Sequence, residues 1–297
     1  MRLHLVDGTF ELFRAHFARR PGHRAPGGWE AKATVGLAAS LLGLLRDGEE
    51  AVTHVAVAFD NPIRSFRNDL FPGYKTEEGV PPELLAQLDA AEEAAGALGV
   101  TAWSMRELEA DDALATGAAR FRDAVEQVRI LTPDKDLGQC LEGRRVVQVD
   151  RIRNREIDEE ALLARRGIRP GSVPDWLALV GDDADGIPGI PGFGEKTASA
   201  LLARYPHLED VPEDPARWPT GIRGADRLAR ELASGREAVL LFRRLATLVR
   251  DAPLPGSLED LRWRGVPRGR FQAWCESLGA RGLRVALEAR PARWAEG

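Results

Sequence analysis

The chain has 297 residues, of which 44% are hydrophobic and 29% charged, so its composition is that of a globular protein with enough apolar side chains for a sizeable core. Its two cysteines, Cys140 and Cys275, exclude a disulfide framework and a cysteine-rich zinc site. The sequence has neither the pattern of a signal peptide nor an apolar stretch of about 20 residues, so we expect a cytoplasmic protein with no membrane span.

The first 150 residues alternate strand-like and helix-like segments. Short apolar runs predict strands at 2–6, 54–59, 128–134 and 145–150. Apolar residues at helical spacing predict helices at 30–46 and 82–98. Strands separated by helices of this length indicate βαβ units and a mostly parallel sheet, in which ligands bind beyond the carboxyl ends of the strands.

From about residue 155 the sequence predicts mainly helices. They are expected at 158–167, 173–181 and 195–205, in two stretches near 223–248, and in a short terminal helix after a loop-rich crossing at 251–268. We therefore predict an α/β core at 1–155 and a helical module at 156–297.

Acidic residues recur at the ends of the predicted elements. Asp7 and Asp60 each end a strand, although aspartate is a poor strand residue. The other candidates lie at the start of a helix, after a third strand or before the glycine-rich segment: Glu109, Asp111, Asp112, Asp134, Asp136, Asp182 and Asp185. Crowded carboxylates repel one another unless a cation that prefers oxygen ligands, such as Mg²⁺ or Mn²⁺, lies between them. A group of this size could hold two such ions.

Several of these acidic residues also have a structural explanation, whereas Asp7 and Asp60 are harder to explain in this way. Acids at a helix start, such as Asp111 and Asp112, interact favourably with the helix dipole. Asp134 and Asp136 could be turn residues, and Asp183 could be a solvated neighbour. The combination is more specific than any one group. Without the nine candidate ligands the formal charge changes from −5 to +4, so the acidic total does not exclude a nucleic-acid substrate.

The segment "GIPGIPGFGEKTASALL" at 186–202 predicts tight turns followed by a helix. Its turns contain Gly186, Gly189, Gly192 and Gly194 with Pro188 and Pro191. The unpaired N–H groups at the start of the helix, together with Lys196, predict a seat for backbone phosphates. The alternative is a helix–hairpin–helix that serves only protein packing.

Five motifs occur in the order and approximate spacing of a known family: "LVDGTFELFRAHFA", "AVAFDNPIRSFRNDLFPGYK", "ELEADDALA", "ILTPDKDLGQCL" and "LVGDDADGIPGIPGFGEKTA". On these motifs the chain resembles the bacterial 5′→3′ exonucleases, meaning the 5′-nuclease domain of DNA polymerase I and its stand-alone relatives, with flap endonucleases as more distant kin. The resemblance implies a PIN-like central sheet, a helical arch at about 62–85, and a helix–three-turn–helix DNA-binding module with its hairpin at 182–205.

The resemblance also implies an activity. We expect a divalent-metal-dependent 5′→3′ exonuclease or 5′-flap endonuclease that hydrolyses DNA, and also RNA primers, by a two-metal mechanism with 5′-phosphate products. The expected cofactors are two Mg²⁺ or Mn²⁺ ions, with K⁺ at the helix–hairpin–helix. The expected partners are DNA with 5′ flaps, nicks, gaps or 5′ ends and RNA–DNA hybrids, bound by a monomer that does not contact a membrane.

The family's functional residues carry over by position. Asp7, Asp60, Glu109, Asp111, Asp112 and Asp134 match the first metal's ligands, and Asp136, Asp182 and Asp185 match the second's. Arg14, Arg67 and Lys75 match catalytic basic residues that stabilise charge on the scissile phosphate, although Arg14 and Arg67 could be surface charges. Tyr74 could stack on an unpaired base or pack in the arch. The expected DNA-binding residues are Tyr74, Gly189, Gly192, Gly194, Lys196 and Thr197.

Relatives usually have a basic residue shortly after the position of Lys75, whereas this chain has Glu77 and Glu78 there. The arch is therefore less basic. Pro133, Gly186 and Leu108 also replace residues that are common in the family, but no departure removes a metal ligand. Two other functions stay open: a catalytically weak DNA-junction-binding protein of the same fold, and a metal-dependent phosphatase, which would have no use for the hairpin.

Overall fold

The computed structural model describes residues 1–289 and 293–295, so 290–292 and 296–297 of the predicted helical module lie outside the described residues. The chain forms two compact units. We call Met1–Ile63, Glu77–Thr132 and Arg250–Gly297 the sheet unit, and Arg64–Thr76 with Pro133–Val249 the helical unit. The predicted domain boundary near residue 155 stays a prediction.

The sheet unit contains four parallel strands in the order β3-β2-β1-β4. They are β1 (Arg2–Asp7), β2 (His54–Asp60), β3 (Thr101–Met105) and β4 (Gln127–Leu131). β2 is buried along its whole length, as expected for a strand covered on both faces. The predicted parallel sheet is confirmed. Because β1 and β2 pair in parallel, Asp7 and Asp60 stand at the carboxyl ends of neighbouring strands.

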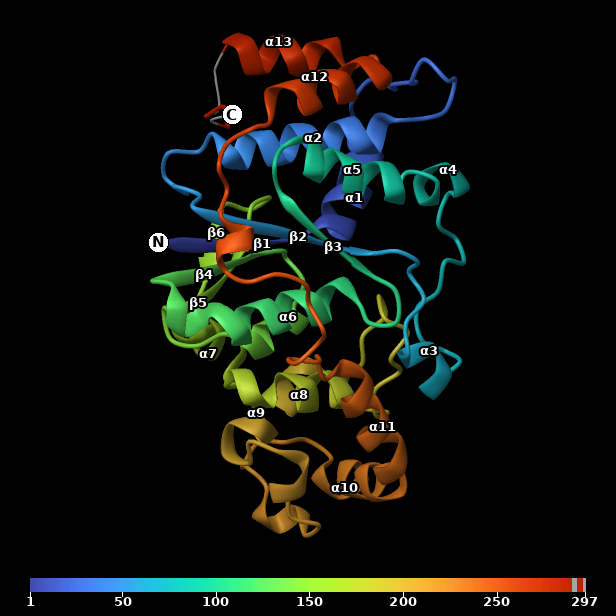
Figure 1. The fold of residues 1–297 in the computed structure, drawn as a ribbon. Helices are drawn as coiled ribbons and strands as arrows, with labels where there is room; N and C mark the ends of the chain where they lie inside the picture. Colours follow the sequence, from blue (N-terminus) through green and yellow to red (C-terminus); the bar gives the residue numbers. More distant parts are fainter. Residues whose placement is uncertain (290–292, 296–297) are drawn as a thin grey trace. The chain divides into compact units, whose positions relative to one another are not determined.

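Helices cover both faces of these four strands (Figure 1). α1 (Gly8–Phe17), α2 (Lys32–Leu45) and α5 (Leu88–Ala97) lie on one face, and α6 (Ala110–Phe121) lies on the other. The helix expected at 82–98 is interrupted, because α4 (Pro82–Leu85) ends before α5 begins. Gln87 lies at this break, fully buried, and its side-chain oxygen accepts hydrogen bonds from the N–H and the hydroxyl of Thr34.

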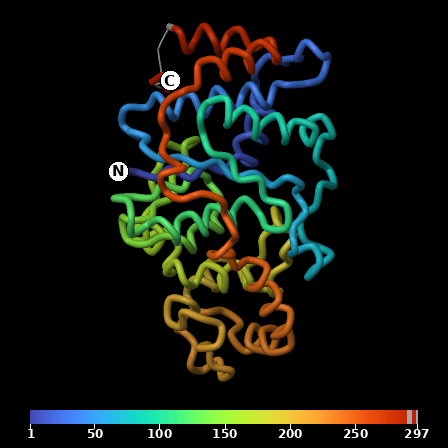
Figure 2. The backbone as a smooth tube through the Cα atoms, in the orientation of Figure 1, coloured from blue at the N-terminus to red at the C-terminus, as the bar shows by residue number. Residues whose placement is uncertain are grey.

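The end of the chain returns to the sheet unit. Trp263 donates its backbone N–H to Thr53 O and its indole N–H to Leu98 O, both at 3.0 Å. Figure 2 shows this return as the orange-to-red trace, which includes α12 (Arg268–Ser277) and α13 (Arg281–Ala289). The single terminal helix that the sequence predicted is therefore two helices.

The helical unit combines one antiparallel strand pair with a bundle of short helices. The strands are β5 (Val146–Asp150) and β6 (Arg155–Ile157). The helices are α3 (Arg67–Leu70), α7 (Glu159–Arg166), α8 (Val173–Val180), α9 (Glu195–Arg204), α10 (Ala225–Ser234) and α11 (Arg236–Ala246). Trp176, Leu177 and Leu201 are buried at the centre of its core. The prediction that the chain becomes mainly helical after about residue 155 is confirmed, whereas the bounds 156–297 of the module stay a prediction.

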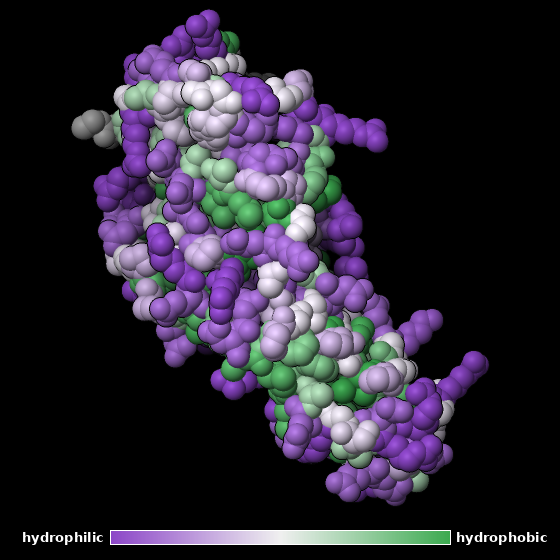
Figure 3. Space-filling view, turned by 90° about the vertical axis from the view of Figure 1, so that its right-hand side faces the viewer, coloured by the Kyte–Doolittle hydropathy of each residue, from purple (hydrophilic) through white to green (hydrophobic). Residues whose placement is uncertain are grey.

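On the face shown in Figure 3, hydrophilic side chains cover most of the area and apolar ones gather in separate patches. In the described part of the chain, none of the helices combines the length and the apolar character that crossing a lipid bilayer requires.

Close backbone packing joins two segments of the helical unit. Gly186 has a φ of +71°, and a Cβ atom there would lie 2.2 Å from the carbonyl oxygen of Gly73. Next to this contact, the N–H of Lys75 donates to Asp185 O at 3.0 Å. The turn after α8 therefore accepts only glycine where it meets the segment before Lys75.

We predict that Gly186→Ala lowers the free energy of unfolding by about 1–3 kcal/mol, because alanine adds both a strained φ and an overlap with backbone. Urea unfolding followed by circular dichroism measures the change. Gly269→Ala in α12 is the control, since a Cβ there meets no atom within 4 Å. Equal stability of the two variants would contradict the packing described.

Candidate active site

Three carboxylates of the helical unit lie together. One oxygen each from Asp136, Asp182 and Asp185 lies within 4.8 Å of the others. Asp136 begins the 3₁₀ helix η2 (Asp136–Cys140), and the other two lie in the turn that follows α8. Carboxylate oxygens are the ligands that Mg²⁺ and Mn²⁺ prefer, so this cluster has the chemistry of a divalent metal site.

Backbone hydrogen bonds fix the two loops that carry the cluster. Asp182 and Ile187 exchange backbone hydrogen bonds of 2.8 Å in both directions, which closes the turn between them. The N–H of Asp136 donates to Asp134 Oδ1 at 2.9 Å. The carboxylates are therefore held in place by their own loops rather than by contact with one another.

The electrostatics of the cluster fit a bound cation. Burial, followed by the charges of Asp134, Asp185 and Asp182, raises the pKa of Asp136 well above its usual range. Asp136 Oδ1 is buried and has no hydrogen-bond partner. An oxygen of this kind is costly to bury unless a cation or proton meets it.

Two lysines partly neutralise the cluster. Lys75 Nζ lies 3.0 Å from Asp185 Oδ1, and Lys135 Nζ lies 2.9 Å from Asp182 Oδ2. Of the predicted catalytic residues, Lys75 is thus brought to the three carboxylates. Lys135 was not predicted for the site, although its position between Asp134 and Asp136 could have indicated it.

The acidic residues of the sheet unit also act as helix caps. Asp7 Oδ1 accepts the N–H of Phe10 at the start of α1, and its Oδ2 accepts the hydroxyl of Thr132 at 2.9 Å. Glu109 and Asp112 form a capping box at the start of α6. The capping box agrees with the structural explanation that the sequence offered for acids at a helix start, and the metal role of these residues stays a prediction.

The remaining predicted ligands lie near these caps or in the other unit. Asp60 accepts the N–H of Ala110 at 2.8 Å and is 8% exposed, and Asp111 is half-buried. Asp134 belongs to the helical unit, where it accepts the N–H of Asp136. The assignment of Asp7, Asp60, Glu109, Asp111, Asp112 and Asp134 to a first metal stays a prediction.

Two of the predicted nucleic-acid contacts near the arch are buried. Arg67 is 1% exposed and donates to Leu245 O at 2.7 Å and to Thr247 O at 3.1 Å, so the surface-charge alternative is wrong for this residue. Tyr74 is 3% exposed and belongs to the apolar core of the helical unit. The structure therefore agrees with the alternative that Tyr74 packs against other side chains.

Arg14 lies on α1 of the sheet unit. Its Nη2 donates to the carboxylate of Glu11 and, at 2.9 Å, to the hydroxyl of Ser40. Glu11 is 2% exposed, so this arginine neutralises a buried carboxylate. A catalytic role for Arg14 stays a prediction.

The glycine-rich hairpin leads directly into α9. Gly189 is buried, whereas Gly192, Gly194 and Lys196 are exposed and Thr197 is half-buried. The first N–H groups of a helix have no acceptor within the helix and carry partial positive charge, so the exposed start of α9 is suited to an anion.

A basic residue that the sequence did not indicate lies over this hairpin. The guanidinium of Arg227, on α10, is so close that a Cβ on Gly192 would lie 2.6 Å from its Nη2. Nothing in the sequence distinguishes this arginine from the 36 others.

Two family descriptions together match residues 2–268. Residues 2–167 match "5'-3' exonuclease, N-terminal resolvase-like domain", and residues 168–268 match "5'-3' exonuclease, C-terminal SAM fold".

The curated relatives that match the chain include DNA polymerases I. The chain is 36% identical over 292 residues to a DNA polymerase I of Mycobacterium tuberculosis and 33% identical over 291 residues to that of Bacillus caldotenax. The alignments cover 96% and 97% of this chain but 31% and 32% of the relatives. The chain therefore spans about a third of the length of these relatives.

Solved structures share the fold. The T5 D15 protein co-crystallised with metal ions has a TM-score of 0.62 at 18% identity, over 84% of this chain and 90% of that one. The catalytic core of Rad2 in complex with DNA substrate has a TM-score of 0.56 at 14% identity, over 93% and 86%. Human GEN1 in complex with Holliday junction DNA has a TM-score of 0.62 at 13% identity, over 94% and 68%.

We predict that Asp136→Asn stabilises the metal-free protein at pH 7 by an amount on the order of 1 kcal/mol, because the amide removes a buried charge from between like charges. The raised pKa means that the folded state holds a proton more tightly than the unfolded state. The stability of the wild type therefore falls as pH rises above about 3.9, the usual pKa of aspartate, and the gain from the amide shrinks towards pH 4.

Urea unfolding in chelator at pH 4 and pH 7 measures this difference. Asp183→Asn is the control, because Asp183 is an exposed acid of the same turn and its replacement is expected to change little. A metal-free Asp136→Asn protein that is less stable than the wild type at pH 7 would contradict the account.

Proposed function

Because the chain belongs to the 5′-3′ exonuclease family, and is therefore a nuclease, we propose that it hydrolyses DNA at 5′ ends and 5′ flaps in a reaction that depends on divalent metal ions. The observation that carries the proposal is the cluster of Asp136, Asp182 and Asp185, in which Asp136 Oδ1 is buried without a partner. The solved structures of the same fold, which include complexes with DNA and with metal ions, support this choice of substrate and cofactor.

The proposed cofactors are two Mg²⁺ or Mn²⁺ ions. Asp136, Asp182 and Asp185 would hold one ion, and the other would be held by Asp7, Asp60, Glu109, Asp111, Asp112 and Asp134. When bound, such ions supply a nucleophile at neutral pH and stabilise charge on the leaving oxygen of a phosphodiester. The products would carry a 5′-phosphate.

The chain's own basic groups would position the nucleic acid. Lys75, 3.0 Å from Asp185, places a positive charge where the scissile phosphate would lie beside the cluster. The start of α9, with Lys196 exposed, would bind backbone phosphates of the duplex without reading its sequence. K⁺ at this hairpin, action on RNA–DNA hybrids and a monomeric state complete the proposal.

We predict that the purified protein cleaves a labelled 5′-flap DNA with Mg²⁺ or Mn²⁺ and does not cleave it in chelator. Asp134→Asn/Asp136→Asn is expected to abolish cleavage, because it removes two carboxylates from the metal centre. Nicked duplex and single strand run on the same gel define the substrate preference. Asp183→Asn is again the control and keeps wild-type activity.

Three results would contradict the proposal. Cleavage by Asp134→Asn/Asp136→Asn at the wild-type rate would remove the carboxylates from the mechanism. Tight flap binding with no product at any Mg²⁺ or Mn²⁺ concentration would favour the DNA-junction-binding alternative. Cleavage that persists in chelator would remove the metal.

A further inference from the structure

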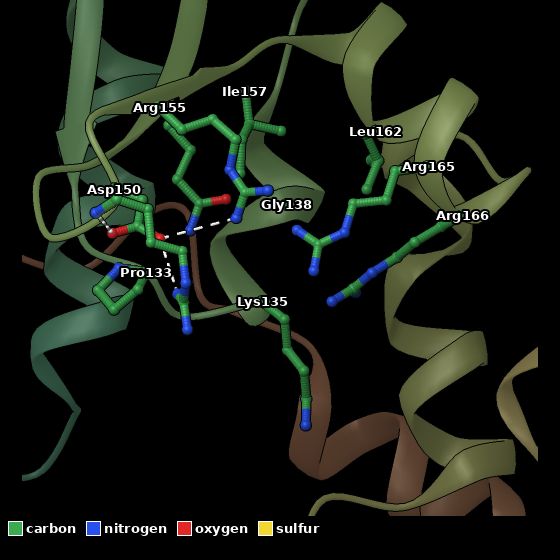
Figure 4. Close-up of a pocket in the computed structure, with 11 residues that line it drawn as sticks. Pro133, Lys135, Gly138, Asp150, Arg155, Ile157, Leu162, Arg165 and Arg166 are labelled. Carbon is green, nitrogen blue, oxygen red and sulfur yellow. Dashed lines mark hydrogen bonds and ion pairs between the residues drawn. The ribbon is translucent and has the colours of Figure 1, made fainter.

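A strongly basic pocket of about 270 Å³ lies in the helical unit, between the β5–β6 pair, η2 and α7 (Figure 4). Its wall includes one carboxylate, from Asp150, and five basic side chains: Lys135, Arg153, Arg155, Arg165 and Arg166. Figure 4 shows Arg155, from β6, and Arg165 and Arg166, both from α7, entering the same space. No residue proposed above to bind metal or DNA lines this pocket.

Two of the five positive charges lack a carboxylate partner. Asp150 Oδ2 lies 2.8 Å from Arg153 Nη1 and 3.8 Å from Arg155 Nη2, and Lys135 is paired with Asp182. Neither Arg165 nor Arg166 forms an ion pair with a carboxylate in the part of the chain that the structure describes. The five basic side chains therefore outnumber the two carboxylates that pair with them, and the pocket lining carries a positive charge that favours an anion.

Arg166 is partly buried and contacts an aromatic ring. Its guanidinium carbon lies 4.6 Å from the ring centroid of Trp176, which restricts the side chain by a cation–π contact. Its Nη1 is buried and has no hydrogen-bond partner. Burial, and then the charge of Arg165, lower the pKa of this guanidinium, while the charges of Glu195, Asp136 and Asp134 act to raise it. A rigid donor that is buried and unpaired is the feature expected where an anion binds.

The pocket borders the metal cluster. Lys135 lines it and also contacts Asp182, and it lies between Asp134 and Asp136 in the sequence. An anion bound here would therefore lie beside the carboxylates that the proposed reaction uses.

We propose that this pocket binds the 5′-terminal phosphate of the strand that is cut, an inference that rests on the proposed nuclease function. A terminal phosphate monoester carries a charge of about −1.5 to −2 at pH 7, whereas each internal phosphodiester carries one negative charge. The guanidiniums of Arg165 and Arg166, neither of which forms an ion pair with a carboxylate, match the more highly charged terminal phosphate. Guanidinium forks are also the donors best suited to phosphate oxygens.

The test compares 5′-phosphorylated and 5′-hydroxyl versions of one flap DNA by fluorescence anisotropy in chelator, so that no strand is cut. The wild type is expected to bind the phosphorylated flap roughly tenfold more tightly, the size expected for one or two charge-assisted hydrogen bonds. Arg165→Ala is expected to bring this ratio close to one. Its control, Arg169→Ala, removes an exposed charge that pairs with Glu159 outside the pocket and leaves the ratio unchanged.

Arg166→Lys is the second variant, because it keeps the charge but loses the fork, and it is expected to lower the ratio only in part. Circular dichroism confirms that each variant is folded. The proposal is overturned if the wild type shows no preference, or if Arg165→Ala weakens both DNAs equally, as a contact to an internal phosphate would. Failure of the nuclease proposal is recognised separately, as loss of cleavage in Mg²⁺ by a protein that still prefers the 5′-phosphate.

Discussion

The helical unit has to hold together three carboxylates that repel one another. Asp136, Asp182 and Asp185 bring oxygens within 4.8 Å of one another, and the first of them is buried. Such a group needs positive charge beside it, or a proton on one of its carboxylates. The chain supplies part of this charge with Lys75 and Lys135, each about 3 Å from one carboxylate. A bound divalent ion would supply the rest.

The surrounding backbone holds this repulsive arrangement in place. The turn that carries Asp182 and Asp185 is closed by its own hydrogen bonds, and at Gly186 it packs so closely on Gly73 that no side chain fits. The same contact brings the segment that carries Lys75 to Asp185. The first part of the glycine-rich hairpin therefore supports the acidic cluster. The exposed start of α9, where the sequence predicted phosphate binding, comes later in the chain.

Local patterns in the sequence predicted the elements whose chemistry is visible along the chain. Apolar runs located β1, β2 and β4, but β3 was missed because "TAWSM" has neither a continuous apolar run nor a regular alternation. At the break between α4 and α5, Gln87 bonds to Thr34, which is 53 residues away in the sequence. Burial of Arg67 and Tyr74 is likewise a tertiary property. The sequence did not distinguish Arg165 and Arg166 from the other arginines among its 37, and only the fold shows that both line one pocket.

The central claim is that the carboxylate cluster is a divalent metal site. Titration of the chelator-treated protein with Mn²⁺, followed by electron paramagnetic resonance of the free ion, tests it most directly. The account expects saturable binding by the wild type and the loss of at least one bound ion in Asp182→Asn, while Asp183→Asn binds as the wild type does. Unchanged Mn²⁺ binding by Asp182→Asn would contradict it.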